Sequence, residues 1–527
     1  MATSKAAGRR IPVVLFLGVA IYALTLALYF VSRYDEQWTE TDTTTITQSI
    51  TALQAEGVLV PRASAYQHGY LYQATSTVIL SLTGLSATQL QSLVYPFISV
   101  LGVVICGLTF YSLVGGDFRL AALSTLLLLL QPDVLFVLLR GSHEKLDWPL
   151  MMTALSLLYL SLGRSSRRQL VFLLLFYLVI FAQIATNAFF ASTFLAATSL
   201  GLLLGVGMQW AMQRRFRLPG GSLRRLLYVS LSGGILLYLS MVYVYPLALA
   251  NLRLLRSIVE QVSALFLSFE VASQPYEYIS FGWISQPVYF GLTAFTWLLI
   301  AVSMAVWVGR GVRIFTGREP LGLQYNLDWL LYAGFALQVA ASIVVDFSGA
   351  LSSNLQLRVF PGFTVLASAL LARAVWQLAG RLRFPGREAL LAAALLGLLA
   401  GWFGVAALLK ASNEPGLSNK WTFYATDEVA AVEWANRRLE DTVLWTGIDE
   451  RIRVGYSFTH TGQPAPGIQL VATTFKDTYP YALISVREQL RAVRVGTSMP
   501  AVLDWLRLYD NGNVQLYHKR PMTPFQQ

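Results

Sequence analysis

The stretch FLGVAIYALTLALYFVSRYDEQWTE, residues 16–40, decides the fold, because an apolar run ends abruptly in a cluster of carboxylates. A helix needs about 20 apolar residues to cross the hydrocarbon layer of a bilayer, and residues 11–32 supply such a run. Asp35, Glu36, Glu40 and Asp42 follow directly. The sequence therefore predicts a first membrane span with acidic groups at the point where the chain leaves the lipid.

The composition extends this prediction to the whole chain. Of its 527 residues, 55% are hydrophobic and only 13% are charged, about half the charged share of a soluble domain. We expect an all-α polytopic membrane protein with about eleven transmembrane helices, near residues 11–32, 92–113, 119–138, 148–163, 169–187, 190–210, 226–248, 287–308, 328–346, 361–380 and 388–409. The first run lacks an A-x-A cleavage site and is too long for a cleaved leader, so it indicates a retained signal anchor.

Basic residues predict the orientation. The net charge is +11, but Lys and Arg gather in short loops between spans, which is the positive-inside pattern and not a nucleic-acid-binding patch. Eighteen fall on the side of the N-terminus and seven in the longer loops opposite. We therefore expect a multi-pass protein of the cytoplasmic membrane, with a cytoplasmic N-terminus and no nucleic-acid partner. The single cysteine, Cys106, excludes a disulfide within the chain.

The pattern divides the chain in two. Residues 1–410 form the transmembrane module, with long outer loops at 33–91 and 249–286. Within these loops, residues 43–57 predict an amphipathic helix with Ile46, Ile50 and Leu53 on its apolar face, and residues 254–269 predict another. Residues 411–527 predict a small extracytoplasmic α/β domain: a helix over 426–439 capped by Thr426 or Asp427, strands at 443–447, 468–473, 481–485 and 514–519, and a hairpin turn at 510–513.

The loop after the third span collects ionisable groups. The stretch LLLLLQPDVLFVLLRGSHEKLDWPL, residues 126–150, carries Arg140, His143, Glu144, Lys145 and Asp147. On a helix, Arg140, Glu144 and Asp147 would share one face. A self-neutralising surface turn is one explanation, but ionisable groups at membrane depth usually line a cavity.

A second isolated cation precedes a late span. Arg358 follows a Ser-rich linker without other charge; snorkelling would explain it, and so would phosphate binding. Together the outer loops offer carboxylates that can deprotonate a hydroxyl, and cations, Arg358, Arg140 and Lys145, that can take up charge on a departing lipid-linked phosphate. A divalent metal such as Mg or Mn could be held by Asp35, Glu36, Glu144 and His143.

In this order the residues resemble the GT-C superfamily of membrane glycosyltransferases, which use polyprenyl-phosphate sugars and include protein mannosyltransferases and aminoarabinose transferases. Tyr34-Asp35-Glu36 is similar to the aromatic-Asp-Glu motif that ends the family's first span. Pro132 and Gly141–Glu144 resemble its proline and second acidic loop, and Arg358–Pro361 its arginine-aromatic-proline motif. Val359 stands where an aromatic is usual, and Tyr66–Tyr70 replaces a His-Pro-Pro-Leu stretch.

The resemblance implies a set of roles. Asp35 would be the general base, Glu36 its partner or a metal ligand, and Arg358 a donor-phosphate contact. His143, Glu144 and Asp147 would belong to the second acidic motif. Further donor or acceptor contacts would come from Tyr34, His68, Tyr70, Arg256, Tyr276 and Tyr278. The enzyme would transfer a hexose or pentose, with inversion, from a polyprenyl-phosphate donor to a glycan, lipid or protein acceptor outside the cytoplasm, and membrane lipid would be a further partner.

Three other functions remain open. A transporter or flippase for lipid-linked oligosaccharides needs polar residues deep within its spans, whereas residues 391–409 contain none. A polysaccharide polymerase or ligase, or an oligosaccharyltransferase, would share the outer-face chemistry. In a receptor whose C-terminal domain does the binding, Asp35→Asn would leave function intact.

Overall fold

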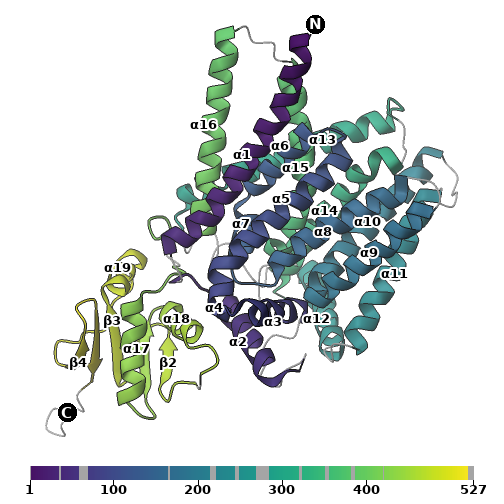
Figure 1. Cartoon of the computed structure of the whole chain (residues 1–527). Helices are drawn as coiled ribbons and strands as arrows, with labels where there is room; N and C mark the ends of the chain where they lie inside the picture. The colour runs from purple at the N-terminus through teal and green to yellow at the C-terminus, as the bar shows by residue number, and fades with distance from the viewer. Residues whose placement is uncertain are drawn as a thin grey trace.

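The computed structural model describes residues 2–34, 37–58, 69–163, 167–213, 221–243, 248–268, 284–319, 323–349, 355–381, 386–418, 421–463 and 465–519. It is mainly helical, with one small sheet near the C-terminus (Figure 1). The helices before the sheet are α1 (Ala2–Tyr34), α2 (Thr41–Glu56), α3 (Leu71–Thr83), α4 (Ala87–Gln89), the π-helical turn η2 (Leu90–Val94), α5 (Tyr95–Gly115), α6 (Phe118–Leu129), α7 (Pro132–Leu139), α8 (Glu144–Gly163), α9 (Arg167–Thr186), α10 (Ala188–Gln213), α11 (Gly221–Tyr243), α12 (Ala248–Ser268), α13 (Gln286–Phe315), α14 (Leu323–Ser348), α15 (Leu355–Arg381) and α16 (Gly386–Ala411).

Ten of the predicted spans each correspond to one of these helices, and the span predicted at 119–138 corresponds to the bent pair α6–α7. Fewer of the described helices are long and apolar enough to cross the membrane. In the described ranges, six helices are long and apolar enough to span a bilayer, and the bent pair α6–α7 would make a seventh. Parts of α1, α11 and α16 form shorter apolar helices. The chain is thus a multi-pass membrane protein, and eleven spans stay a prediction.

Small residues allow two of the helices, α10 and α14, to approach closely. A Cβ added at Gly334 would lie 1.9 Å from the carbonyl oxygen of Ala197, and one at Gly201 would lie 2.6 Å from that of Leu330. Helices within a bilayer gain little from the hydrophobic effect, so close backbone packing of this kind contributes much of their association. The two glycines therefore allow the backbones of α10 and α14 to pack directly against each other.

Several charged side chains inside the bundle are paired. At the end of the bundle remote from the sheet, Asp328 accepts hydrogen bonds from Arg310 at 3.1 Å and from Arg373 at 2.6 Å. Arg373 of α15 thus binds a carboxylate within the bundle. Near the other end, Lys410 of α16 pairs with Asp133 of α7 at 3.2 Å, where α6 and α7 bend by 77° around Leu130 and Gln131.

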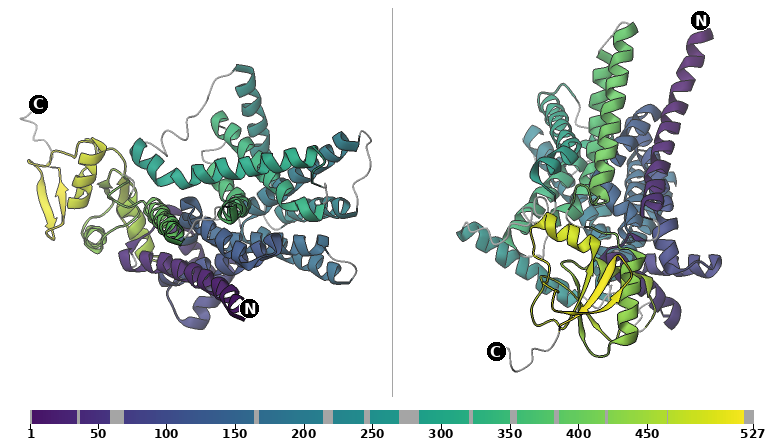
Figure 2. Two further views of the ribbon diagram at one scale, coloured as in Figure 1. Left: turned by 90° about the horizontal axis from the view of Figure 1, so that it is seen from above. Right: turned by 90° about the vertical axis from the view of Figure 1, so that its left-hand side faces the viewer.

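The predicted amphipathic helices are present. Ile46, Ile50 and Leu53 of α2 are buried, as their spacing predicts, and α12 covers the predicted helix at 254–269. Gly57 ends α2 with a φ of 66°, a left-handed conformation that favours glycine. In Figures 1 and 2, α2, α3 and α12 lie across the end of the bundle that faces the sheet.

The C-terminal region is a five-stranded mixed sheet with three helices. The strands β1 (Val443–Gly447), β2 (Gln469–Ala472), β3 (Tyr481–Ser485), β4 (Leu506–Asp510) and β5 (Val514–His518) lie in the order β2-β1-β3-β5-β4. β1 pairs in parallel with β2 and β3, whereas β5 is antiparallel to β3 and β4. The helices are α17 (Thr426–Arg438), α18 (Arg451–Thr459) and α19 (Val486–Val495). The four predicted strands are confirmed, and β4, α18 and α19 were not predicted.

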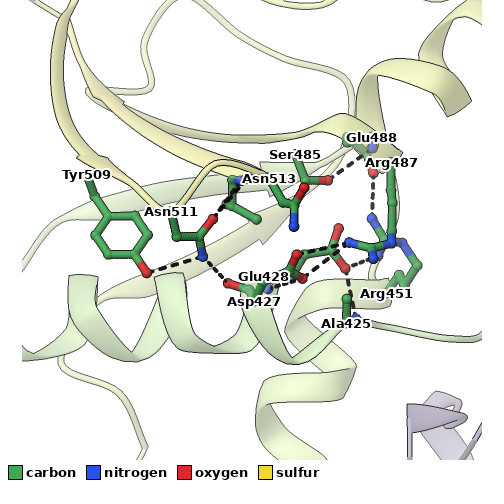
Figure 3. Close-up of polar contacts among 11 residues, drawn as sticks. Ala425, Asp427, Glu428, Arg451, Ser485, Arg487, Glu488, Tyr509, Asn511 and Asn513 are labelled. Carbon is green, nitrogen blue, oxygen red and sulfur yellow. Dashed lines mark hydrogen bonds and ion pairs between the residues drawn. The ribbon is translucent and has the colours of Figure 1, made fainter.

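A buried polar network holds this region together (Figure 3). The Arg451 side chain is fully buried between Glu428, with which it forms an ion pair, and Glu488, at 3.2 Å. Glu428 also accepts the backbone N–H of Ala425 at 3.0 Å, so Ala425 occupies the N-cap position of α17. The prediction of a cap at Thr426 or Asp427 was therefore wrong, because the carboxylate three residues into the helix satisfies the free N–H.

Candidate functional site

The end of α1 is tied to the segment that links α16 to the sheet. The Tyr34 hydroxyl donates to Glu414 at 2.5 Å, and Arg33 donates to the same carboxylate at 2.7 Å. Burial alone would raise the pKa of Glu414, but the hydrogen bonds from Tyr34 and Arg33 outweigh it, so the pKa lies below its usual range. Tyr34, expected to contact substrate, is thus buried and committed to a structural hydrogen bond.

The chain just beyond α1 pairs with the start of the C-terminal domain. Trp38 and Phe423 form an antiparallel bridge, with backbone hydrogen bonds of 2.9 Å from Thr39 to Thr422 and from Tyr424 to Gln37. These contacts fix residues 37–39 against the C-terminal domain. Further along, the hydroxyl of Thr41 in α2 donates to Glu450 at 2.5 Å, next to α18.

A buried charge cluster lies where this first loop meets the loop after α7. The Arg140 guanidinium pairs with Glu144, with Glu40 at 3.2 Å and with Asp42 at 3.4 Å, and only 12% of its side chain is exposed. The predicted Arg140–Glu144 pair is present, but the predicted shared helical face is wrong. Arg140 has an extended backbone after α7, and α8 begins only at Glu144. The chain turns between them, with Gly141 donating to Thr43 of α2 at 3.1 Å.

The remaining ionisable groups of this loop are buried. His143 pairs through Nε2 with the side-chain amide of Asn187, at the α9–α10 junction, at 2.5 Å. The Lys145 ammonium is fully buried and lies 5.1 Å from the centre of the Tyr95 ring. Asp147 is 1% exposed, and neither carboxylate oxygen has a hydrogen-bond partner among the described residues. A buried, unpartnered carboxylate is costly, which marks Asp147 as a candidate for contact with a ligand.

A small pocket lies beside the charge cluster. It is partly open to solvent, its enclosed part has room for about one water molecule, and it is lined by Phe30, Trp38, Thr43, Gln91, Ser92, Leu139, Gly141 and Phe458. These residues come from α1, the first loop, η2, the Arg140 loop and α18. The buried N–H groups of Trp38 Nε1 and Gln91 Nε2 have no partner among the described residues. They can donate to oxygen atoms of a ligand.

Other predicted residues lie apart from this cluster or outside the described residues. Arg358 is exposed in the first turn of α15, and no ion pair joins it to the cluster in the described part of the chain. Arg256 forms an exposed pair with Glu260 on α12. Tyr70 is buried, and its N–H donates to Ala185 at 2.7 Å. The remaining predicted residues, Asp35, Glu36, His68, Tyr276 and Tyr278, lie outside the described residues.

The described residues do not form a metal site by themselves. Across the ranges described above, no three His, Cys, Asp or Glu side chains are arranged to hold a metal ion. Of the four predicted ligands, Glu144 pairs with Arg140 and His143 with Asn187.

Four residues of the site escaped the sequence analysis. Glu40 and Asp42 were noticed as part of the acidic stretch but were given no role, although Arg140 binds both. The acidic stretch itself was the available signal. Asn187 sits in an otherwise apolar run, and a polar amide at membrane depth is such a signal too. Glu414 offered no signal.

Comparison with known proteins rests on structure alone. No family model and no curated protein sequence matches the chain. The oligosaccharyltransferase of Archaeoglobus fulgidus in the apo form matches 92% of this chain and 70% of its own, with a TM-score of 0.57 and 11% identity. The same protein, AglB, in complex with an inhibitory peptide and a dolichol-phosphate gives a TM-score of 0.56 over the same shares, with 12% identity. Its complex with Zn and sulfate gives 0.57, with 12% identity, over 90% of this chain and 68% of that one.

The structural match extends through both parts of the chain, since it covers nearly all of the sequence. At 11–12% identity, the structural match shows a shared fold, and the activity is a separate question. The fold of this chain is therefore similar to that of the Archaeoglobus fulgidus oligosaccharyltransferase.

Proposed function

We propose that the chain is an integral membrane glycosyltransferase that moves a sugar from a polyprenyl-phosphate donor to an acceptor outside the cytoplasm. One observation carries the proposal: within a GT-C fold, the largely buried Arg140, paired with Glu40, Asp42 and the buried Glu144, adjoins a pocket between the first loop and the C-terminal domain. Ionisable groups buried in this way are costly, and they concentrate at sites of ligand binding and catalysis.

The chemistry assigns a general base and a phosphate contact. In the proposal, Asp35 accepts the proton of the attacking acceptor hydroxyl, Glu36 supports it, and the bond from the sugar to the phosphate breaks with inversion at the sugar. Arg358 and the buried cations Arg140 and Lys145 stabilise the negative charge that remains on the phosphate. A divalent metal at Asp35 and Glu36 would stabilise the same charge.

The acceptor would enter between the first loop and the C-terminal domain. Two features support this route. The pocket lies there, and its unpartnered donors, Trp38 Nε1 and Gln91 Nε2, suit the hydroxyl oxygens of a sugar. Hydrogen bonds to those buried groups would also offset the cost of leaving them without partners.

Transfer by the purified full-length chain tests the proposal. In nanodiscs, the wild type should move radiolabel from one of a panel of polyprenyl-phosphate sugars to a lipid, glycan or peptide acceptor. Asp35→Asn should slow transfer by about 100-fold or more, the usual contribution of a general base, while the donor still binds. Glu260→Gln is the matched control, because it removes a carboxylate that is 61% exposed on α12. Transfer by Asp35→Asn at the wild-type rate would remove the proposed base.

The phosphate contact has its own comparison. Arg358→Ala should raise the KM for the donor several-fold, whereas Arg437→Ala, which removes a 70% exposed arginine that pairs with its helical neighbour Glu433 on α17, should leave KM unchanged. Equal effects of the two substitutions would indicate general attraction to anionic lipid and would contradict a specific contact.

A further inference from the structure

Helix α19 of the C-terminal domain exposes an unusual apolar face. Val486, Leu490 and Val493 are 47%, 59% and 81% exposed. They recur at the spacing i, i+4, i+7, which places them on one side of a helix. The opposite side, with Glu488, Arg491 and Ala492, is buried against the domain. The apolar face of α19, defined by these three valine and leucine residues, therefore points away from its own domain.

The two ends of α19 are connected to the segments that follow α16 and α1. At its end, Arg494 donates to the carbonyl oxygens of Pro415 and Gly416, a few residues after α16 finishes at Ala411. Its start follows β3, and Ser485 and Asp427 belong to the network around Ala425. Ala425 in turn follows the pairing of Tyr424 with Gln37, just beyond α1.

These ties orient the helix. The right-hand view of Figure 2 shows α19 running across the end of α16, on the side of the sheet that faces the helical bundle. Because the domain covers the other side of α19, the apolar face is left on the outside of the domain. α16 also exposes Leu398, Trp402 and Val405, as expected of a lipid-facing helix.

We propose that the apolar face of α19 inserts into the surface of the lipid bilayer and anchors the C-terminal domain to the membrane. Amphipathic helices that lie in the interface combine apolar residues on one face with Lys or Arg on the other. α19 has the apolar face of such a helix, while its basic residues Arg487 and Arg494 are held by Asp427 and by the carbonyl oxygens of Pro415 and Gly416. The apolar side chains therefore carry the proposed anchor.

A protein partner fits the face less well. Three apolar side chains on a ten-residue helix form a small patch, whereas a specific protein interface uses about 20–30 residues a side. The bilayer, by contrast, would lie beside α19, because Arg494 at the end of α19 binds Pro415, which follows the end of α16 by four residues. The inserted helix would hold the domain at one height, close to the pocket between it and the first loop.

Site-directed fluorescence in nanodiscs of phosphatidylcholine and phosphatidylglycerol tests this inference. In a Cys106→Ala background, Val493→Cys is labelled with an environment-sensitive fluorophore. Leu503→Cys is the matched control: Leu503 is 97% exposed and apolar, and it precedes the far end of β4, opposite the start of α19. The end of β4 that follows Leu503 and the end that lies beside the start of α19 are about 16 Å apart, because a strand rises about 3.3 Å per residue.

The expected result is a contrast between the two labels. Doxyl-labelled lipid should quench the fluorophore at 493 several-fold more strongly than the one at 503, and aqueous iodide should show the reverse order. Equal quenching of both positions by iodide would overturn the inference. Protection of position 493 from both quenchers would overturn it as well, because that result indicates a second protein surface over α19. Both positions are exposed, so labelling leaves the fold intact.

Discussion

Replacing Arg140 with Gln should destabilise the membrane module more than any exposed arginine substitution. Arg140 pairs with Glu40, Asp42 and Glu144. Removing it would leave three carboxylates close together, each repelling the others. Glutamine keeps part of the volume and some hydrogen bonding, so the substitution chiefly tests the charge.

The structure sets the magnitude. Breaking a buried pair costs about 3–5 kcal/mol, because the remaining charge stays desolvated. Here Glu144 is 8% exposed, Glu40 19% and Asp42 41%, so water screens Asp42 and partly screens Glu40. We therefore expect a cost of about 3 kcal/mol, near the lower limit of that range. Adding Glu144→Gln should recover part of it by removing the most buried carboxylate.

The single cysteine provides the assay. Cys106 in α5 is half-buried, so a thiol-reactive dye added to detergent-solubilised protein reports unfolding as this residue becomes accessible. The expected order of thermal midpoints is wild type and Arg256→Gln together, then the Arg140→Gln/Glu144→Gln double variant, then Arg140→Gln. A midpoint for Arg140→Gln equal to that of Arg256→Gln would refute the reasoning, since it would mean that the buried cluster carries no net electrostatic stabilisation.

Three further outcomes follow from particular contacts. Gly334→Ala should lower the thermal midpoint in the same dye assay, because its methyl group would collide with the α10 backbone, whereas Gly397→Ala, with open space around it, should not. Arg451→Leu should cost about 3–5 kcal/mol in the C-terminal domain, since it strands two buried carboxylates; limited proteolysis of residues 421–519 should become faster. The pKa of Glu414 is lower in the folded state than in the unfolded state. Its ionised carboxylate therefore stabilises the folded state at pH values above the unfolded pKa of about 4.3, and this stabilisation disappears as the pH falls through the folded pKa. Acid should therefore loosen the α1 contact in the wild type more than in Glu414→Gln, measured by the same proteolysis between pH 3 and 7, approximate limits set by that pKa.

Local patterns explain which predictions held. The helices follow from long apolar runs, and four strands follow from alternation of apolar and polar residues, because both signals depend on neighbours only a few residues apart. The same limit explains the misses. Helix α19 has only ten residues and is rich in charge, so its single short apolar stripe gave no clear helix signal, and β4 is mostly exposed.

The sequence by itself determined that this chain is a polytopic membrane protein, that ionisable groups gather at the ends of its spans, and that a small α/β region follows them. Only the tertiary structure decided which charges meet. Arg140 binds Glu40 and Asp42 from about a hundred residues earlier, and Tyr34 binds Glu414 from the far end of the membrane module. Such pairings depend on how helices pack and where a loop turns, and those distances are set by contacts between segments that no local pattern relates.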